Sequence, residues 1–193
     1  MSTHKKSVKL SDPIALRAYA HPLRMALVGL LRREGPLTAT QAAERLGESV
    51  PNCSFHLRQL AKYGLAERVP GSDARERPWQ ATAMFTTWEN DSDDPETRAA
   101  AGHLSRVVFE RHVERVRQAF AQQDAEPARW RKVIGSSDYV LYLTAEELSA
   151  LIDKAEELFA EYLPRLTDPA ARPAGSRAIQ LLQVTIPLER PAK

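Results

Sequence analysis

A tight succession of helix start and stop signals, early in the chain, constrains the fold more than any other feature. Thr38 and Gln41 have the Ser/Thr-x-x-Glu/Gln spacing of a capping box, and Gly47 ends the short helix that they open. A second helix is expected over residues 49–63, with Ser49 at its start and a proline in its first turn. The sequence therefore predicts two short helices joined by a tight turn.

The regions on either side of this helix pair extend the pattern. Apolar residues at helical spacing predict two more helices between residues 12 and 35. After the pair, residues 65–69 and 78–82 are predicted as two strands that a Pro-Gly turn connects. Helices followed by such a hairpin are typical of a winged helix-turn-helix domain, which we expect at residues 12–88 with its wing at 70–78.

The predicted helix at 49–63 has two unlike faces. Its inward stripe has steps of three and four residues and is formed by Val50, Cys53, Leu57 and Leu60. The outward and flanking positions carry polar, basic and aromatic side chains, which are Asn52, Ser54, Phe55, His56, Arg58, Gln59 and Lys62. One face is thus expected to pack on the domain and the other to remain available to a partner.

A long helix is predicted next. The acidic stretch 89–95 is expected to be a linker that leads into a helix from about residue 96 to 123. The helix has an apolar seam, and this seam predicts a homodimer interface formed by Leu104, Val108, Phe109, Val113, Val116 and Phe120. The alternative is that the helix packs on its own domain.

Residues 96–193 are expected to combine this helix with a small strand-helix-strand unit, which makes the fold class α+β. The predicted strands are 137–143 and 179–188, and a capping box at Thr144 opens the helix between them. The unit could enclose an apolar pocket for a small organic effector, lined by Tyr139, Tyr142, Phe159 and Tyr162. At these spacings, aromatic residues more often form plain core.

Charge is distributed unevenly along the chain. Residues 1–83 carry 13 Lys and Arg against 7 Asp and Glu, whereas the remainder carries 14 against 18. Residues 1–11 are predicted to be a flexible basic tail. A basic half favours a polyanionic partner such as nucleic acid, although the same imbalance is found on ordinary solvated surfaces.

Several classes of protein are disfavoured by what the sequence lacks. It has no apolar run of membrane-spanning length and no signal-peptide pattern at its start, so we expect a cytoplasmic location and no membrane partner. Its single cysteine cannot form an internal disulfide. Without a glycine-rich phosphate loop or a nucleophile elbow, an enzyme is not expected.

The helix pair also carries a family resemblance. The run Ser54-x-His56-Leu57-x-x-Leu60-x-x-x-Gly64-Leu65 is similar to the recognition-helix signature of ArsR-type bacterial repressors, and residues 18–31 resemble the first helices of that family. Residues 141–148 resemble the C-terminal extension of a subgroup common in actinomycetes. The resemblance implies a homodimeric, sequence-specific transcriptional regulator that binds double-stranded DNA. It also implies that 49–63 lies in the major groove and the wing on the backbone or in the minor groove.

The candidate DNA-binding residues carry donors, acceptors or apolar groups able to reach bases or phosphates. They are Thr38, Thr40, Gln41, Asn52, Ser54, Phe55, His56, Arg58, Gln59, Lys62, Arg75 and Arg77. Some have a structural alternative. Phe55 either contacts a thymine methyl group or packs on a neighbouring element, and His56 either contacts DNA or is a satisfied structural group. Thr38 and Gln41 either face phosphate or serve only as helix caps.

The resemblance also raises the question of metal sensing, because many members of the family are metal sensors. Their thiolate site needs paired cysteines, which this chain lacks. His103 and His112 are nine residues apart, about 180° around a helix, and so cannot easily share an ion. No metal or cofactor is therefore expected, and Cys53 on the buried face is expected to be inert.

One function of a different class stays open. The winged helix could serve as a protein–protein interaction module in a transcription complex, without specific DNA reading. The acidic second half would then be the working surface. Replacement of Arg58 by alanine separates the two functions, since only the DNA-binding hypothesis predicts a loss of affinity for DNA.

Overall fold

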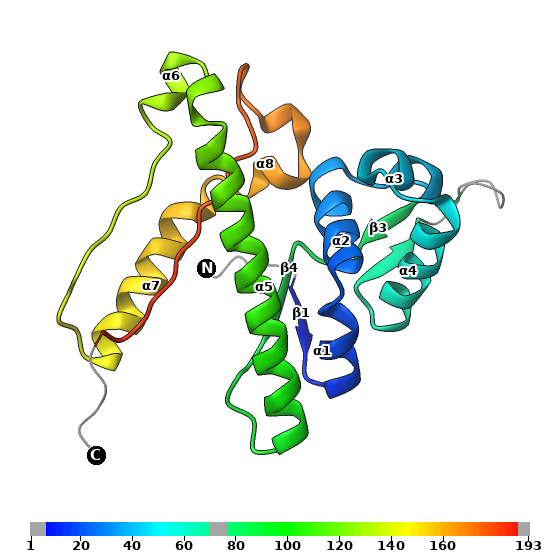
Figure 1. Ribbon diagram of the computed structural model, residues 1–193, viewed down its shortest axis with the longest axis horizontal. Helices are drawn as coiled ribbons and strands as arrows, with labels where there is room; N and C mark the ends of the chain where they lie inside the picture. Colours follow the sequence, from blue (N-terminus) through cyan, green and yellow to red (C-terminus); the bar gives the residue numbers. More distant parts are fainter. Residues whose placement is uncertain (1–6, 70–76, 189–193) are drawn as a thin grey trace.

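The computed structural model describes residues 7–69 and 77–188, and the chain has the predicted α+β class (Figure 1). The N-terminal part contains β1 (Ser7–Leu10), α1 (Pro13–Tyr19), α2 (Pro22–Glu34), α3 (Ala39–Leu46), α4 (Val50–Lys62), β2 (Ala66–Arg68), β3 (Trp79–Ala81) and β4 (Phe85–Trp88). The remainder contains α5 (Pro95–Ala121), α6 (Ala128–Arg131), α7 (Ala145–Ala160) and α8 (Pro164–Thr167), with single 3-10 turns at Gln123–Ala125 and Pro169–Ala171.

The helix-turn-helix forms as predicted from its caps. The Thr38 N–H donates to Gln41 Oε1 over 2.8 Å, and the Gln41 N–H donates to Thr38 Oγ1 over 3.2 Å. Gly47 ends α3 with a φ of 66°, in the left-handed region that favours glycine. Ser49 caps α4 by accepting a hydrogen bond from the Asn52 N–H. The turn between α3 and α4 is therefore fixed by local hydrogen bonds.

The predicted hairpin follows α4. Strands β2 and β3 pair antiparallel, with Ala66 opposite Ala81 and Arg68 opposite Trp79. The main chain of Leu37, just before α3, exchanges hydrogen bonds of 2.9 and 2.7 Å with that of Trp79. The hairpin is thus attached to the start of the helix-turn-helix. Its tip, residues 70–76, lies outside the described residues.

The prediction of a flexible tail at 1–11 is wrong for its last residues. Ser7–Leu10 form β1, which pairs in parallel with β4. Leu10 is buried, and Lys9 forms an ion pair with Glu89. A four-residue strand has no local signature, and its partner lies more than seventy positions away. The sequence pattern therefore missed both strands.

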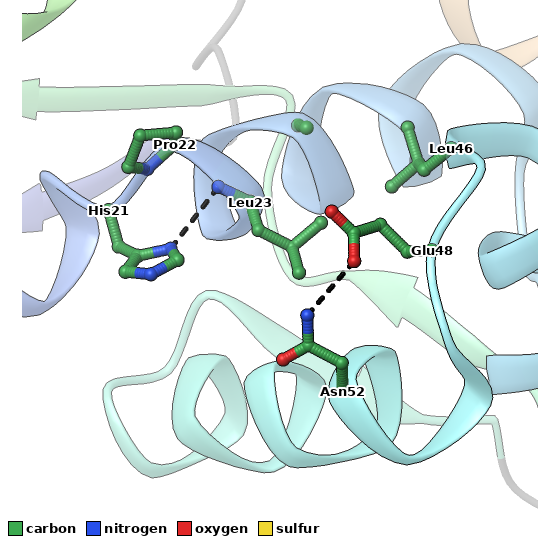
Figure 2. Close-up of a pocket in the computed structure, with 7 residues that line it drawn as sticks. His21, Pro22, Leu23, Leu46, Glu48 and Asn52 are labelled. Atoms are coloured by element: carbon green, nitrogen blue, oxygen red, sulfur yellow. Dashed lines mark hydrogen bonds between the residues drawn. The ribbon is translucent and has the colours of Figure 1, made fainter.

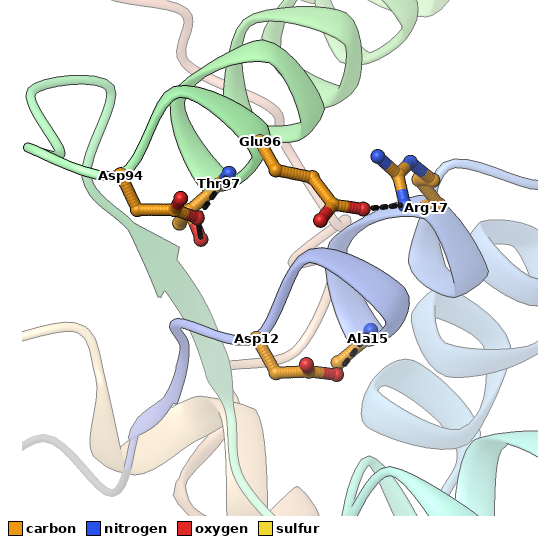
Figure 3. A network of polar contacts seen from close by, with 6 residues as sticks. All are labelled: Asp12, Ala15, Arg17, Asp94, Glu96 and Thr97. Atoms are coloured by element: carbon orange, nitrogen blue, oxygen red, sulfur yellow. Dashed lines mark hydrogen bonds and ion pairs between the residues drawn. The ribbon is translucent and has the colours of Figure 1, made fainter.

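Strand β4 leads into α5, whose first half packs on α1. Asp12 caps α1 and Asp94 caps α5 (Figure 3). Arg17, in the last turn of α1, forms a 2.8 Å ion pair with Glu96 in the first turn of α5. Ala100, Ala101 and Leu104 are buried in the same core as α1 to α4. The predicted boundary at 89–95 consequently does not separate two cores.

Beyond Leu104, no residue up to 188 is buried. The capping box at Thr144 opens α7 as predicted, but 137–143 and 179–188 form no strands and are exposed. The predicted strand-helix-strand unit is therefore wrong for the single chain. Strands need neighbours for their main-chain hydrogen bonds, and neither segment meets one. In the described ranges, no helix is long and apolar enough to cross a membrane.

Candidate nucleic-acid interface

Helix α4 presents one face to the core and the other to solvent. Cys53, Leu57 and Leu60 are buried as predicted. Val50, predicted to be inward, is exposed because the first turn of α4 projects from the core. The opposite face carries exposed Phe55, Arg58 and Lys62 at helical spacing. We call these three residues the outward row.

A group of arginines extends the outward row toward the hairpin. Arg68 on β2 stacks over the Trp79 ring, with its guanidinium carbon 4.0 Å from the ring centroid, and donates a hydrogen bond to the carbonyl of Arg77. Burial lowers the pKa of Arg68, and the nearby charges of Arg77 and Arg58 lower it further. These three arginines therefore share one positive region, which would attract an anion. We call them the arginine cluster.

Arg68 is not among the DNA-binding residues predicted from the sequence. The available signal was a basic residue at the end of a short strand, next to the predicted wing, but such residues are common on solvated hairpins. Only the packing on Trp79 distinguishes this one. Of the two arginines predicted on the wing, Arg77 is exposed and joins the cluster, whereas Arg75 lies outside the described residues.

The structure does not support DNA contact by His56. Its side chain is only 8% exposed, and its ring stacks on that of His21, with 4.4 Å between centroids. Phe55 meets the same ring edge-on at 5.1 Å while remaining 50% exposed. His56 Nδ1 is buried and has no hydrogen-bond partner among the described residues. The His56 side chain therefore packs α4 against the start of α2. The Phe55 ring packs on His56 with one edge and leaves half of its surface exposed to solvent.

The start of α4 is tied to the preceding turn. The Asn52 side-chain amide donates to Glu48 Oε2 over 3.0 Å, and His21 Nδ1 accepts from the Leu23 N–H over 3.2 Å, capping α2 (Figure 2). Between them lies a pocket of about 360 Å³, lined by His21, Pro22, Leu23, Ala26, Leu46, Glu48 and Asn52. Asn52 is therefore engaged within the protein through its amide N–H.

The remaining candidates divide by exposure. Thr38 and Gln41 use their side chains in the capping box of α3, which is the structural alternative predicted for them. Thr40, next to them, is exposed. Ser54 and Gln59 are half-buried on the flanks of α4. The outward row, the arginine cluster and Thr40 are thus the best-exposed parts of the predicted interface.

The predicted dimerisation seam is split along α5. Leu104 is 0% exposed, and Val108 packs against the core of its own chain. Leu104 is therefore a core residue rather than an interface residue, because this half of the helix rests on α1. Phe109, Val116 and Phe120 are exposed and Val113 is half-buried. Only the second half of the seam is open to a partner.

The four aromatic residues predicted to line an effector pocket do not enclose one in the single chain. Tyr139 is 79% exposed and Tyr142 is 91% exposed, and Phe159 and Tyr162 are exposed as well. The prediction depended on two strands folding over α7, and these strands do not form. The same residues instead belong to the exposed large hydrophobic side chains of the C-terminal half.

The single cysteine lies on the buried face of α4. Cys53 is fully buried, and burial raises the pKa of its thiol above the ordinary value, which keeps the thiol protonated. Within residues 7–69 and 77–188, no group of three His, Cys, Asp or Glu side chains could hold a metal ion.

Comparisons with known proteins agree with the helix-turn-helix geometry. No sequence among curated proteins matches the chain. A solved structure, that of the transcriptional regulator Tm0710 from Thermotoga maritima, aligns with 80% of this chain and 88% of its own at 13% identity. Its TM-score is 0.31, and a likeness this weak supports no conclusion. Residues 19–69 match the family model of a helix-turn-helix domain, which spans α2, α3, α4 and β2.

Proposed function

We propose that this protein is a sequence-specific DNA-binding transcriptional regulator of the ArsR type that acts as a homodimeric repressor. The observation that carries the proposal is the exposure of the outward row on a helix whose opposite face is fixed in the core. A helix held in this way can enter the major groove of duplex DNA without losing its packing.

The chemistry of the exposed face suits this role. Arg58 can donate two parallel hydrogen bonds to O6 and N7 of a guanine, and Phe55 can contact a thymine methyl group. Arg68 and Arg77, on the hairpin, are suited to phosphate or to the minor groove beside it. Base contacts would come from α4 and positioning contacts from the hairpin, which is the usual division in winged helices.

The apolar side chains on the second half of α5 support the homodimer. Phe109, Val116 and Phe120 expose large apolar groups on one helix. A second copy related by a two-fold axis would cover them. Dimers of this kind bind two half-sites about one DNA turn, roughly 34 Å, apart. The expected operator is therefore an inverted repeat. Binding over a promoter would exclude RNA polymerase, and this gives repression.

The decisive experiment measures binding to the DNA upstream of the protein's own coding region. Wild-type protein should protect an inverted repeat from cleavage, and Arg58→Ala should lose about 1–3 kcal/mol of binding free energy and relax specificity at one base pair. Arg106→Ala removes an exposed arginine from α5 and is the matched control. A reporter under this promoter should be derepressed by Arg58→Ala.

Two results would contradict the proposal. Protection without sequence preference over bulk DNA at moderate salt would exclude specific reading. Equal affinity of Arg58→Ala and wild-type protein for the operator would favour the alternative, in which the winged helix binds another protein of a transcription complex.

A further inference from the structure

Residues 105–188 have no core of their own. None of them is buried, whereas the continuous apolar core of the chain ends at Leu104. Helix α7 has sixteen residues and a capping box at its start, yet buries no residue. An isolated amphipathic helix of this length is only marginally stable in water, because helices in proteins depend on the packing of their apolar face. This part of the chain therefore needs a partner to acquire a core.

The accessible surface area of the chain indicates how much surface is left uncovered in a single copy. It measures 14230 Å², whereas a compact monomer of this mass exposes about 9,200 Å². Even if the residues outside the described ranges were all fully exposed, they would account for only about 2,900 Å² of the difference. Roughly 2,000 Å² per chain remains. Two chains together would bury about 4,000 Å², which lies in the range of obligate homodimers.

After Leu104, an exposed set of large apolar side chains lies on consecutive elements. It comprises Phe109, Val116 and Phe120 on α5, Tyr139 to Leu143 in the connection to α7, Leu151, Leu158 and Phe159 on α7, and Ile179, Leu181, Leu182, Val184, Ile186 and Leu188 near the C-terminus. So many exposed large apolar side chains on one half of a chain are unusual for a monomer, on which extended apolar patches are rare.

Charge around this surface favours a second copy of the same chain as the partner. Helix α7 carries five acidic residues and one lysine, whereas residues 115–132, at the end of α5 and through α6, carry five basic residues and two acidic ones. In an antiparallel pair of identical chains, α7 of one copy can face the basic end of the other, twice by symmetry. The surface is therefore complementary to itself in charge as well as in polarity.

Two extended segments of this half differ in how they are held. Segment 179–188 is held against α5, because Arg115 donates a hydrogen bond to Gln180 Oε1 over 3.2 Å. Just before the segment, Arg177 forms a bidentate ion pair with Glu126, after the end of α5, at 2.6 and 2.9 Å. Segment 137–143 leaves α6 and runs to the start of α7 as an exposed connection (Figure 1). The first segment is anchored in its own chain, and the second has no hydrogen bond to another element among those found in residues 7–69 and 77–188.

Both segments have the side-chain pattern of β-strands, although neither pairs with another strand in the single chain. From Leu182 to Leu188, every second residue is apolar, and Gln183 and Thr185 alternate with them. Residues 139–143 are apolar at every position, as in a strand covered on both faces. An anchored strand with an open edge and an unanchored apolar strand are suited to pair with each other, which satisfies the main-chain groups of both.

We propose that residues 105–188 acquire their core only in the homodimer, where the arm 137–143 of each copy pairs as a strand with segment 179–186 of the other copy. This inference rests on the proposed homodimer and adds which segments are exchanged. The αβ unit expected from the sequence would then be completed by two chains. Folding of the C-terminal half and dimerisation would be one event.

A mixed crosslinking experiment on the full chain tests the exchange. One chain carries Leu141→Cys and the other, with a tag of different mass, carries Val184→Cys. After the two are refolded together, a short bis-maleimide should give a covalent heterodimer as the main crosslinked product. Each variant alone and the pair Leu141→Cys with Arg17→Cys are controls, since Arg17 lies exposed on α1. Cys53 is fully buried and should not compete.

The outcomes of this experiment test the arm exchange separately from the homodimer and from DNA binding. A chain that carries both Leu141→Cys and Val184→Cys should crosslink to dimer mass, and a product of monomer mass would show that the segments meet within one chain and would overturn the exchange. A non-covalent dimer that gives no mixed product would overturn the exchange and leave the homodimer intact. Monomer mass without crosslinker at micromolar concentration would overturn both, while operator protection tests DNA reading independently.

Discussion

The imidazole rings of His21 and His56 stack with their centroids 4.4 Å apart and their planes tilted by 31°. This contact joins the start of α2, which His21 caps, to the middle of α4. Burial lowers the pKa of both imidazoles, and the Arg24 guanidinium lowers both further, against a smaller opposing effect of Glu48. For His56, the neighbouring His21 contributes as well. Both rings are thus held neutral in the fold.

This stack predicts that the free energy of unfolding decreases as the solution becomes acidic. A lowered pKa in the folded state means that the unfolded chain binds more protons below the ordinary histidine value of 6.5. The free energy of unfolding should therefore be at its full value above pH 6.5, and should decrease as the pH falls below 6.5 toward the lowered pKa. Melting temperatures measured by circular dichroism between pH 8 and 5, in roughly half-unit steps, would show the slope.

Two variants isolate the contribution of the stack. His56→Gln removes a titrating ring and should flatten the slope, leaving the parts due to His21 and to His112, whose pKa burial also lowers. Gln59→Ala replaces a residue of the same helix that does not titrate and should leave the slope as it is. A slope that His56→Gln does not alter would mean that His56 is not held neutral by its surroundings.

Arg68 should contribute to DNA binding through its charge. Arg68→Ala is expected to weaken binding about equally for specific and unrelated DNA, and to reduce the slope of log affinity against log salt by about 1, as for one lost phosphate contact. Arg68→Lys keeps the charge and should keep most of that slope. Binding titrations between 50 and 200 mM salt, about the usual range, provide the comparison. An unchanged slope in Arg68→Ala would place Arg68 outside the interface.

Thr38 should stabilise α3 as its cap. Thr38→Ala is expected to lower the free energy of unfolding by about 1 kcal/mol, because it leaves the Gln41 N–H without its acceptor. Thr38→Ser retains the hydroxyl and should restore most of the loss. Denaturant unfolding of both variants gives the result. If Thr38→Ala weakened DNA binding with no loss of stability, the hydroxyl would instead face phosphate.

The two halves of the seam on α5 should respond differently to substitution. Leu104→Ala opens a cavity in the core and is expected to cost about 2–5 kcal/mol of unfolding free energy without changing the oligomeric state. Phe120→Glu places a charge on the exposed half and should shift the protein toward monomers. Denaturant unfolding and sedimentation measure the two effects. A dimer unaffected by Phe120→Glu would show that the second half of α5 is not the interface.

Local signals were sufficient wherever the structure is held by neighbours in sequence. The capping box of α3, the glycine that ends it and the serine that caps α4 act over three or four residues, and each forms as predicted. The buried stripe at Cys53, Leu57 and Leu60 follows from helical spacing alone. Residues 137–143 form no strand within the single chain for the opposite reason, since a strand exists only where another chain segment pairs with it.

The sequence by itself determined the helix-turn-helix, the hairpin and the two faces of α4, because periodicity and capping are properties of short windows. Only the tertiary structure decided that His56 stacks on His21, that Arg68 lies with Arg58 and Arg77, and that Leu104 belongs to the core. Each of these depends on contacts between separate elements, and nothing in the periodicity of one segment specifies which side chain of another element will come to lie beside it.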